Sequence, residues 1–258
     1  MPTFVPQLGD IDHDGRVDLI SGSNCCAPKQ FHWFPGKRDG GFSELKSAVM
    51  VFAGEPSLKV DKSESRPYLI DWDRDGRDDI VVVLEVIGSD SNRVGYRIFV
   101  NTHRQLPRDE QAGMEWHFRG FDFGSNDPMS QLDRDLRTHE RRTNIHFAFA
   151  DYDQDGHFDA LFCETAYRIE LQADDEGSYR RNKKIRSGVY LMKNLAAAGA
   201  PVFSAPKKIF DAPANWGFTS IAVTDIQNNG TLNIVTGVTR ENATDPRVQE
   251  AELWLLSR

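Results

Sequence analysis

The sequence has few cysteines, no excess of basic residues and no long apolar run. Only Cys25, Cys26 and Cys163 are cysteines among 258 residues, which excludes a disulfide framework and predicts buried free thiols. The formal net charge of −8 argues against nucleic acid and anionic membranes as partners. No run approaches the roughly 18 apolar residues of a membrane span, so we expect no membrane insertion.

The sequence motifs of several enzyme classes are also missing. There is no G-x-S-x-G nucleophile elbow, no H-E-x-x-H zinc pair, no phosphate-binding G-x-x-x-x-G-K-[ST] and no C-x-x-C. The seven histidines are scattered along the chain rather than clustered. These absences favour a binding module over an enzyme of those classes.

Four short stretches share one spacing of oxygen-bearing residues and glycine. Side chains with oxygen atoms occupy positions 1, 3, 5 and 9, and glycine occupies position 6. We call the stretches loop 1 (residues 10–18), loop 2 (71–79), loop 3 (151–159) and loop 4 (225–233). The side chains are Asp10, Asp12, Asp14 and Asp18; Asp71, Asp73, Asp75 and Asp79; Asp151, Asp153, Asp155 and Asp159; and Asp225, Gln227, Asn229 and Asn233.

This spacing predicts calcium binding, because Ca²⁺ takes six to eight oxygen ligands and the glycine permits a sharp turn. The backbone carbonyls at position 7, those of Arg16, Arg77 and His157, are expected as further ligands. Loop 4 has a single carboxylate, so we expect weak metal binding or none there, with Asn and Gln bonding the loop backbone instead. The alternative is that Asp/Gly clusters are ordinary solvated turns.

An EF-hand has the same opening pattern but requires a glutamate at position 12 and flanking helices. Position 12 is occupied here by Ser21, Val82, Phe162 and Thr236, and apolar runs typical of buried strands follow the glycines. Each loop is therefore predicted to join two β-strands.

The loop starts, at residues 10, 71, 151 and 225, indicate a repeat protein with units of approximately 1–60, 61–135, 136–212 and 213–258. We expect inner strands at 3–8, 67–70, 145–150 and 219–224, and second strands directly after the loops. Third strands are expected at 31–34, 96–100, 189–192 and 253–256, and fourth strands at 48–52, 116–121 and 207–210. Four short strands per unit predict an all-β fold, a β-propeller of four repeats forming one domain over residues 1–258.

Residues 9–19, 71–80 and 151–160, with the strand endings at 99–101 and 192–194, resemble VCBS repeats of the wider FG-GAP-like repeat group. The resemblance implies a β-propeller, often seven-bladed, with calcium in the inter-strand loops and an extracellular, periplasmic or cell-surface location. Four repeats then form a four-bladed ring or an open arc of a larger propeller. The first residues lack the features of a signal peptide, so a protein that stays inside the cell, a mature form or a fragment is expected.

Basic and aromatic residues precede or begin the expected inner strands, which surround one mouth of the channel in a propeller. Arginines beside an aromatic ring suit an acidic or sugar ligand, whereas the simpler interpretation is that they cap strands and pair with acidic neighbours. The possible ligand-binding residues are Arg66, Arg141, Arg142, Asn215 and Trp216.

We therefore predict a non-enzymatic, calcium-binding repeat module whose loops bind a protein or a polysaccharide. One alternative is a carbohydrate-active enzyme, a polysaccharide lyase or sugar dehydratase, with Arg66, Arg142 and Trp216 converging at the channel mouth. Another is a fragment of a larger multidomain surface protein. The longest insertion is 102–144, and the polar stretch 167–184 is expected to form the tip of an elongated hairpin.

Overall fold

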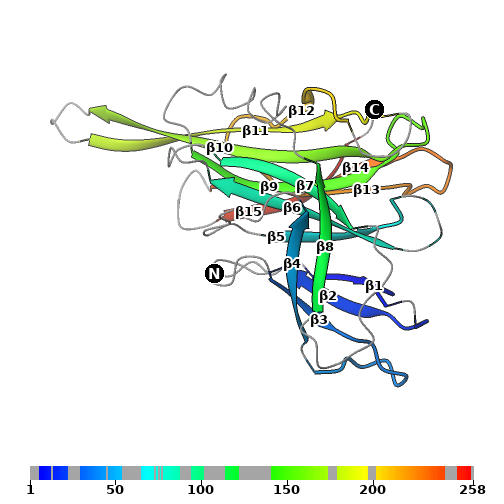
Figure 1. Ribbon diagram of the computed structural model, residues 1–258. Coiled ribbons are helices and arrows are strands. Elements are labelled where there is room, and N and C mark those ends of the chain that lie inside the picture. Colours follow the sequence, from blue (N-terminus) through cyan, green and yellow to red (C-terminus); the bar gives the residue numbers. More distant parts are fainter. Residues whose placement is uncertain are drawn as a thin grey trace. The chain divides into compact units, whose positions relative to one another are not determined.

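The computed structural model shows an all-β protein (Figure 1). It describes residues 6–12, 14–22, 30–44, 46–53, 65–72, 74, 76, 78–87, 94–101, 114–121, 141–173, 179–196, 202–241 and 249–256. Within these ranges every element of secondary structure is a β-strand, which confirms the predicted all-β class.

The first two repeats each form four strands that pair antiparallel in chain order. The first consists of β1 (Pro6–Gly9), β2 (Asp18–Gly22), β3 (Gln30–Phe34) and β4 (Lys46–Ala53). The second consists of β5 (Ser65–Ile70), β6 (Asp79–Ile87), β7 (Val94–Asn101) and β8 (Met114–Phe121). These strands overlap the expected ranges.

The third repeat has the same order, and the fourth has three strands within the described part of the chain. The third consists of β9 (Arg141–Ala150), β10 (Asp159–Ala173), β11 (Tyr179–Met192) and β12 (Lys207–Asp211). The fourth consists of β13 (Trp216–Thr224), β14 (Asn233–Glu241) and β15 (Gln249–Leu256). The pairing of β10 with β11 continues to Ala173 and Tyr179, so the predicted elongated hairpin is confirmed.

One pairing differs from the expectation of a separate sheet for each repeat. The outer strands β4 and β8 pair in parallel, so that the first two repeats form a single eight-stranded sheet. Each of these strands ends its own four-stranded array and has an edge of unpaired N–H and C=O groups. Pairing the two edges satisfies these groups, which explains why they join.

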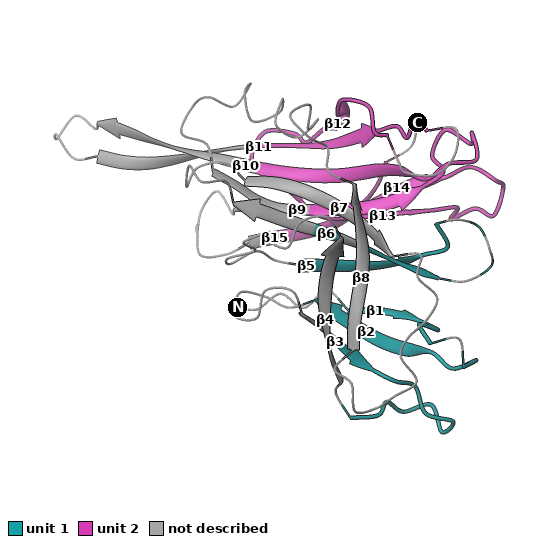
Figure 2. Cartoon of the chain, in the orientation of Figure 1, with its two compact units in different colours: residues 1–127 teal, residues 128–258 magenta. Residues whose placement is uncertain are grey.

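The chain divides into two compact units, unit 1 (Met1–Asp127) and unit 2 (Pro128–Arg258), each holding two repeats (Figure 2). Within unit 1, β5 lies against β1 and β2. Gly9 packs closely against a side chain of β5, because a Cβ on Gly9 would lie 2.6 Å from Cδ1 of Leu69. Within unit 2, β13 lies against β9, β10 and β11. Inner strands of consecutive repeats therefore contact each other inside each unit, while one domain over residues 1–258 stays a prediction.

The core of unit 2 lies between the third and fourth repeats. It contains Leu161, Val189, Phe218 and Ile234, all fully buried, together with the buried free thiol of Cys163. The expected buried free thiol is therefore confirmed for this cysteine, whereas Cys25 and Cys26 lie outside the described residues.

Two buried hydroxyl groups connect this core to the backbone of β13. Thr165 Oγ1 donates to the carbonyl of Phe218 at 2.7 Å, and the Phe218 N–H donates to Ser187 Oγ at 2.9 Å. The two hydroxyl oxygens lie 2.8 Å apart. Because these bonds satisfy polar groups at a bulge of β13, they fix the fourth repeat against the third.

Candidate metal-binding loops

Each acidic loop joins the first and second strands of its repeat, as predicted. Loop 1 connects β1 to β2, loop 2 connects β5 to β6, loop 3 connects β9 to β10, and loop 4 connects β13 to β14. No helix flanks any of them within the described residues. The EF-hand alternative is therefore excluded by the structure as well as by position 12.

The four loops share one backbone turn. In each, the carboxylate at position 1 accepts a hydrogen bond from the N–H of the glycine at position 6. The distances are 2.9 Å for Asp10–Gly15, 2.9 Å for Asp71–Gly76, 3.0 Å for Asp151–Gly156 and 2.6 Å for Asp225–Gly230. The four glycines have φ between 81° and 96°. An L residue is strained at such φ, which is why glycine occupies position 6.

The aspartate at position 9 ties each of the first three loops together. Asp18, Asp79 and Asp159 are buried and accept the N–H of the residue at position 2, at 3.1, 2.9 and 3.2 Å. The second oxygen of Asp18 accepts from Gly36 N, and that of Asp159 from Asn194 N, in the segments after β3 and β11. These carboxylates therefore hold the loop to the third strand. Burial raises the pKa of Asp159, and the Asn194 N–H opposes that rise.

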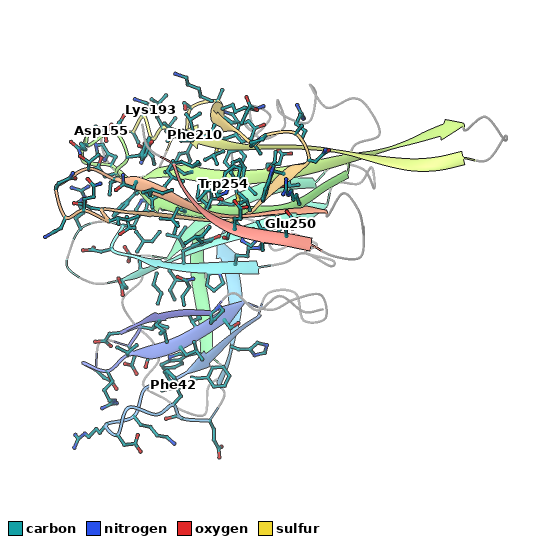
Figure 3. The ribbon with its side chains drawn as sticks, turned by 180° about the vertical axis from the view of Figure 1, so that it is seen from behind. Phe42, Asp155, Lys193, Phe210, Glu250 and Trp254 are labelled. Carbon is teal, nitrogen blue, oxygen red and sulfur yellow. The ribbon has the colours of Figure 1, made fainter. Side chains whose placement is uncertain are left out.

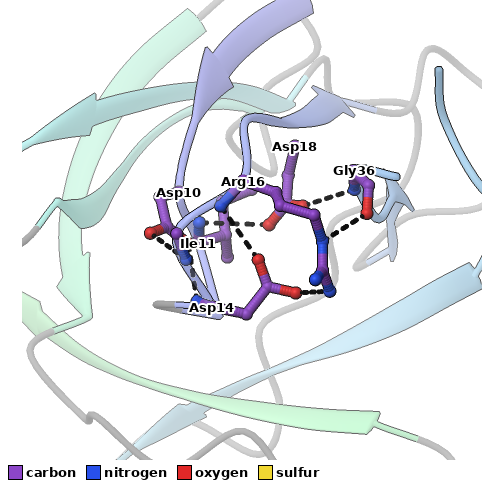
Figure 4. Close-up of polar contacts among 7 residues, drawn as sticks. Asp10, Ile11, Asp14, Arg16, Asp18 and Gly36 are labelled. Atoms are coloured by element: carbon purple, nitrogen blue, oxygen red, sulfur yellow. Dashed lines mark hydrogen bonds and ion pairs between the residues drawn. The ribbon is translucent and has the colours of Figure 1, made fainter. Parts of the chain in front are cut away.

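Loop 1 gathers three of its four predicted carboxylates. Ligand atoms of Asp10, Asp12 and Asp18 lie within 4.8 Å of one another. Asp14 does not belong to this trio, because it pairs with the guanidinium of Arg16, whose Nε also donates to the carbonyl of Gly36 at 2.9 Å (Figure 4). The carboxylate at position 5 of loop 1 therefore forms an ion pair with a side chain of the same loop.

Loop 3 gathers a different trio. Ligand atoms of Asp151, Asp153 and Asp155 lie within 4.8 Å of one another, while Asp159 at position 9 does not belong to the group. Asp153 Oδ2 lies 2.7 Å from Nζ of Lys193. The hydrogen bond from this ammonium lowers the pKa of Asp153 despite partial burial, and raises the pKa of Lys193. Asp153 Oδ1 is buried and has no hydrogen-bond partner.

Loop 2 is described in part. Asp71 and Asp79 make the same backbone hydrogen bonds as their counterparts in loops 1 and 3. Asp73, Asp75 and Arg77 lie outside the described residues, so their predicted roles as ligands stay predictions.

Loop 4 keeps the turn with amides in place of carboxylates. Asn229 Oδ1 accepts the N–H of Thr231 at 2.9 Å, and Asn229 Nδ2 donates to Gln227 Oε1 at 3.1 Å. Asn229 therefore bonds the loop backbone as expected, whereas Gln227 Oε1 accepts from the side chain of Asn229. Asn233, at position 9, begins β14. Desolvation raises the pKa of Asp225, but hydrogen bonds from the N–H groups of Asn229 and Gly230 outweigh this effect, so the pKa lies below its ordinary value.

Replacement of Asp225 by Asn is expected to destabilise the protein in a pH-dependent way. Because the folded-state pKa lies below the ordinary 3.8, the charged form contributes stability above pH 3.8, and this is lost as the pH falls through the folded pKa. The variant should therefore unfold more easily at pH 7, and the difference should shrink in acid. Urea unfolding across pH measures it, with Asp211→Asn as a control for lost charge. A pH-independent difference would contradict the prediction.

The described donors fit a hard divalent cation. Both trios offer only carboxylate oxygens, the ligand type that Ca²⁺ prefers. The buried Asp153 Oδ1 is costly to leave without a partner, and a bound cation would satisfy it. Loop 4 does not fit, because Asp225 is its only carboxylate and neutral amides take the other ligand positions.

The residues predicted as a ligand site are placed as follows. Arg66 is half-buried on β5 in unit 1, and Asn215 is exposed in the turn before β13 with φ of 67°. Arg141 and Arg142 begin β9, where their side chains are not described. Trp216 is 8% exposed and belongs to the unit 2 core.

Trp216 is covered by partners that its position in the sequence does not reveal. Its ring centroid lies 5.1 Å from that of Trp254 and 4.7 Å from the guanidinium carbon of Arg240. A side chain buried in this way has little surface left for a sugar ring. The enzyme alternative therefore gains no support from this residue.

The sequence interpretation missed one residue that contacts a candidate metal-binding loop, Lys193. Its place follows from the strand register of the structure, since Ala160 pairs with Met192 and the next residues outward are Asp159 and Lys193. A lysine opposite position 9 of an acidic loop lies within reach of its carboxylates.

These features define an all-β repeat protein with carboxylate clusters in its inter-strand loops. Residues 10–82 match the family model of the FG-GAP-like repeat, which confirms the resemblance over loops 1 and 2. No curated protein gave a significant match to the chain. The part of the chain that the structure describes contains no helix with the length and hydropathy of a membrane span.

Proposed function

We propose that the protein is a calcium-stabilised repeat module of the β-propeller type that presents its loops to a protein or polysaccharide ligand. The observation that carries the proposal is the Asp151, Asp153 and Asp155 trio of loop 3, which follows the calcium-loop spacing and leaves a buried carboxylate oxygen without a hydrogen-bond partner. The FG-GAP-like match over residues 10–82 supports the same assignment.

In this proposal the loops 1 to 3 each hold one Ca²⁺ through carboxylates at positions 1, 3 and 5 or 9 and the carbonyl at position 7. A bound Ca²⁺ supplies positive charge that offsets the repulsion among the carboxylates of a loop. The position-9 aspartate fixes the loop to the second and third strands, as Asp159 does through Tyr152 and Asn194. Folding and ion binding are thereby coupled.

The repeats are proposed to form the blades of a propeller, either a closed four-bladed ring or an arc of a larger one. The contacts of β5 with β1 and β2, and of β13 with β9 to β11, support stacking of consecutive repeats. We propose an extracellular, periplasmic or cell-surface location, where free Ca²⁺ is high enough to occupy sites with Kd of about 10⁻⁴ to 10⁻³ M.

Calorimetric titration of the metal-free protein with CaCl₂ tests the proposal. We expect three bound ions, with loop 4 remaining empty because it lacks carboxylates. Asp153→Asn should remove one ion, whereas Asp225→Asn should leave the number unchanged. A wild-type protein that binds no Ca²⁺ at millimolar concentration would refute the calcium assignment.

Ligand binding requires a separate measurement. A panel of soluble polysaccharides is screened by microarray in CaCl₂ and again in EDTA, because loops ordered by an ion should bind more tightly than free ones. Calcium-dependent binding to one polysaccharide class supports a carbohydrate ligand. Failure to bind any of them would favour a protein ligand.

A further inference from the structure

The backbone of Lys193 is held beside loop 3 by hydrogen bonds. This residue follows β11 directly, and its backbone bonds to Ser204 in both directions, with N to Oγ at 2.9 Å and Ser204 N to the Lys193 carbonyl at 2.8 Å. The next residue, Asn194, donates to the position-9 carboxylate of Asp159 at 2.9 Å. The backbone of Lys193 is therefore fixed by the segment that also anchors the loop.

The side chain of Lys193 lies partly in water, so it can leave its contact with Asp153. It is 49% exposed, whereas that of Asp153 is 21% exposed. Figure 3 shows Lys193 and Asp155 close together at the same end of unit 2, so the ammonium lies at the rim of the carboxylate trio. A lysine stem half in water can swing outward at small cost.

Loop 1 has a proline, not a lysine, at the corresponding position of its repeat. By strand register, Pro35 occupies the place of Lys193, because Gly36 N donates to Asp18 as Asn194 N donates to Asp159. The cation of loop 1 is Arg16, which pairs with Asp14 outside the trio. The two loops thus have the same motif and different internal counter-cations.

We propose that Lys193 is an internal counter-cation that competes with the divalent ion for Asp153, making loop 3 a weaker and more exchangeable calcium site than its four aspartates suggest. This inference rests on the proposed calcium binding. An ion that binds Asp153 Oδ2 must displace the Lys193 ammonium, which now lies 2.7 Å from that oxygen. A single ammonium leaves Asp153 Oδ1 without a partner, so the divalent ion still wins at sufficient concentration.

The competition has two opposite consequences for stability. Without metal, Lys193 offsets part of the repulsion among Asp151, Asp153 and Asp155, so it stabilises the empty loop. With metal, the displaced lysine stays near a divalent cation of like charge and weakens its binding. Removal of the lysine charge should therefore destabilise the metal-free protein and strengthen calcium binding at the same time, which a merely structural salt bridge would not do.

Lys193→Gln tests this by calorimetric titration with CaCl₂. We expect loop 3, identified as the site lost in Asp153→Asn, to bind Ca²⁺ about threefold to tenfold more tightly at low ionic strength, with a smaller gain at 0.5 M NaCl. Lys193→Arg should keep the weaker binding. Lys208→Gln, which breaks the ion pair with Asp211 on β12, is the matched control and should leave all calcium affinities unchanged.

Thermal melting gives a second readout. In EDTA, Lys193→Gln should melt at a lower temperature than wild type, and CaCl₂ should raise its melting temperature by more. Equal loop 3 affinity in wild type and Lys193→Gln would overturn the competition while leaving calcium binding intact. Absence of loop 3 binding in both proteins would instead refute the proposed function for this loop.

Discussion

Removal of calcium is expected to lower the melting temperature by about 16 to 32 °C. An ion that binds only the folded state contributes about 2.7 kcal/mol at a hundredfold excess over its Kd. The three proposed sites, those of loops 1 to 3, then contribute about 8 kcal/mol together. For a chain of this size, one kcal/mol corresponds to about 2 to 4 °C. Calorimetry in CaCl₂ and in EDTA measures the difference.

Asp153→Ala is the matched variant for the chelation experiment. It should reproduce part of the loss in CaCl₂, because the loop 3 site is removed while loop 1 is intact. In EDTA its melting temperature should lie near that of the wild type, lowered only by loss of the exposed pair with Lys193. Return of excess CaCl₂ should restore the full melting temperature of the wild type, whereas the variant should recover only the part that loops 1 and 2 contribute. Identical melting curves with and without chelator would remove the metal from the stability of this protein.

Phe218→Ala is expected to cost about 3 to 5 kcal/mol of unfolding free energy in unit 2. Phe218 is fully buried on β13 and packs in the core formed with Leu161 and Val189. Its ring lies 6.4 Å from that of Trp254 in an edge-on arrangement. Truncation leaves a cavity where the fourth repeat meets the third, and urea unfolding followed by tryptophan fluorescence measures the loss.

Leu253→Ala is the control for this substitution. Leu253 is 76% exposed on β15, so the substitution removes apolar atoms that are already in water. Its cost should stay within about 0.5 kcal/mol. Phe218→Leu should fall between the two, since it fills part of the cavity. A cost below about 1 kcal/mol for Phe218→Ala would show that the contact between these repeats is not the core of unit 2.

The strands and loops were predictable because their determinants are local. An apolar run after an Asp/Gly turn specifies a strand wherever it occurs, and β6 and β14 both begin at position 9 of a loop, as the spacing predicts. Glycine occupies position 6 because the turn itself requires φ near 90° at that position, as at Gly156. Four copies of one pattern therefore gave four similar turns.

The composition of each carboxylate trio was not predictable from the spacing. Loop 1 includes position 9 and excludes position 5, because Arg16 draws Asp14 away. Loop 3 includes position 5, and its counter-cation comes from 40 residues further along the chain. The spacing assigns the same roles to both loops, so it could not distinguish them.

The sequence by itself determined the all-β class, the order of strands in each repeat and the turn at each acidic loop, since these depend on residues close together in the chain. Tertiary structure alone decided the parallel pairing of β4 with β8 and the burial of Trp216 beneath Trp254 and Arg240. It also decided the ion pair between Lys193 and Asp153. Each of these joins segments distant in sequence, and the free energy of such a contact depends on what the fold brings alongside it.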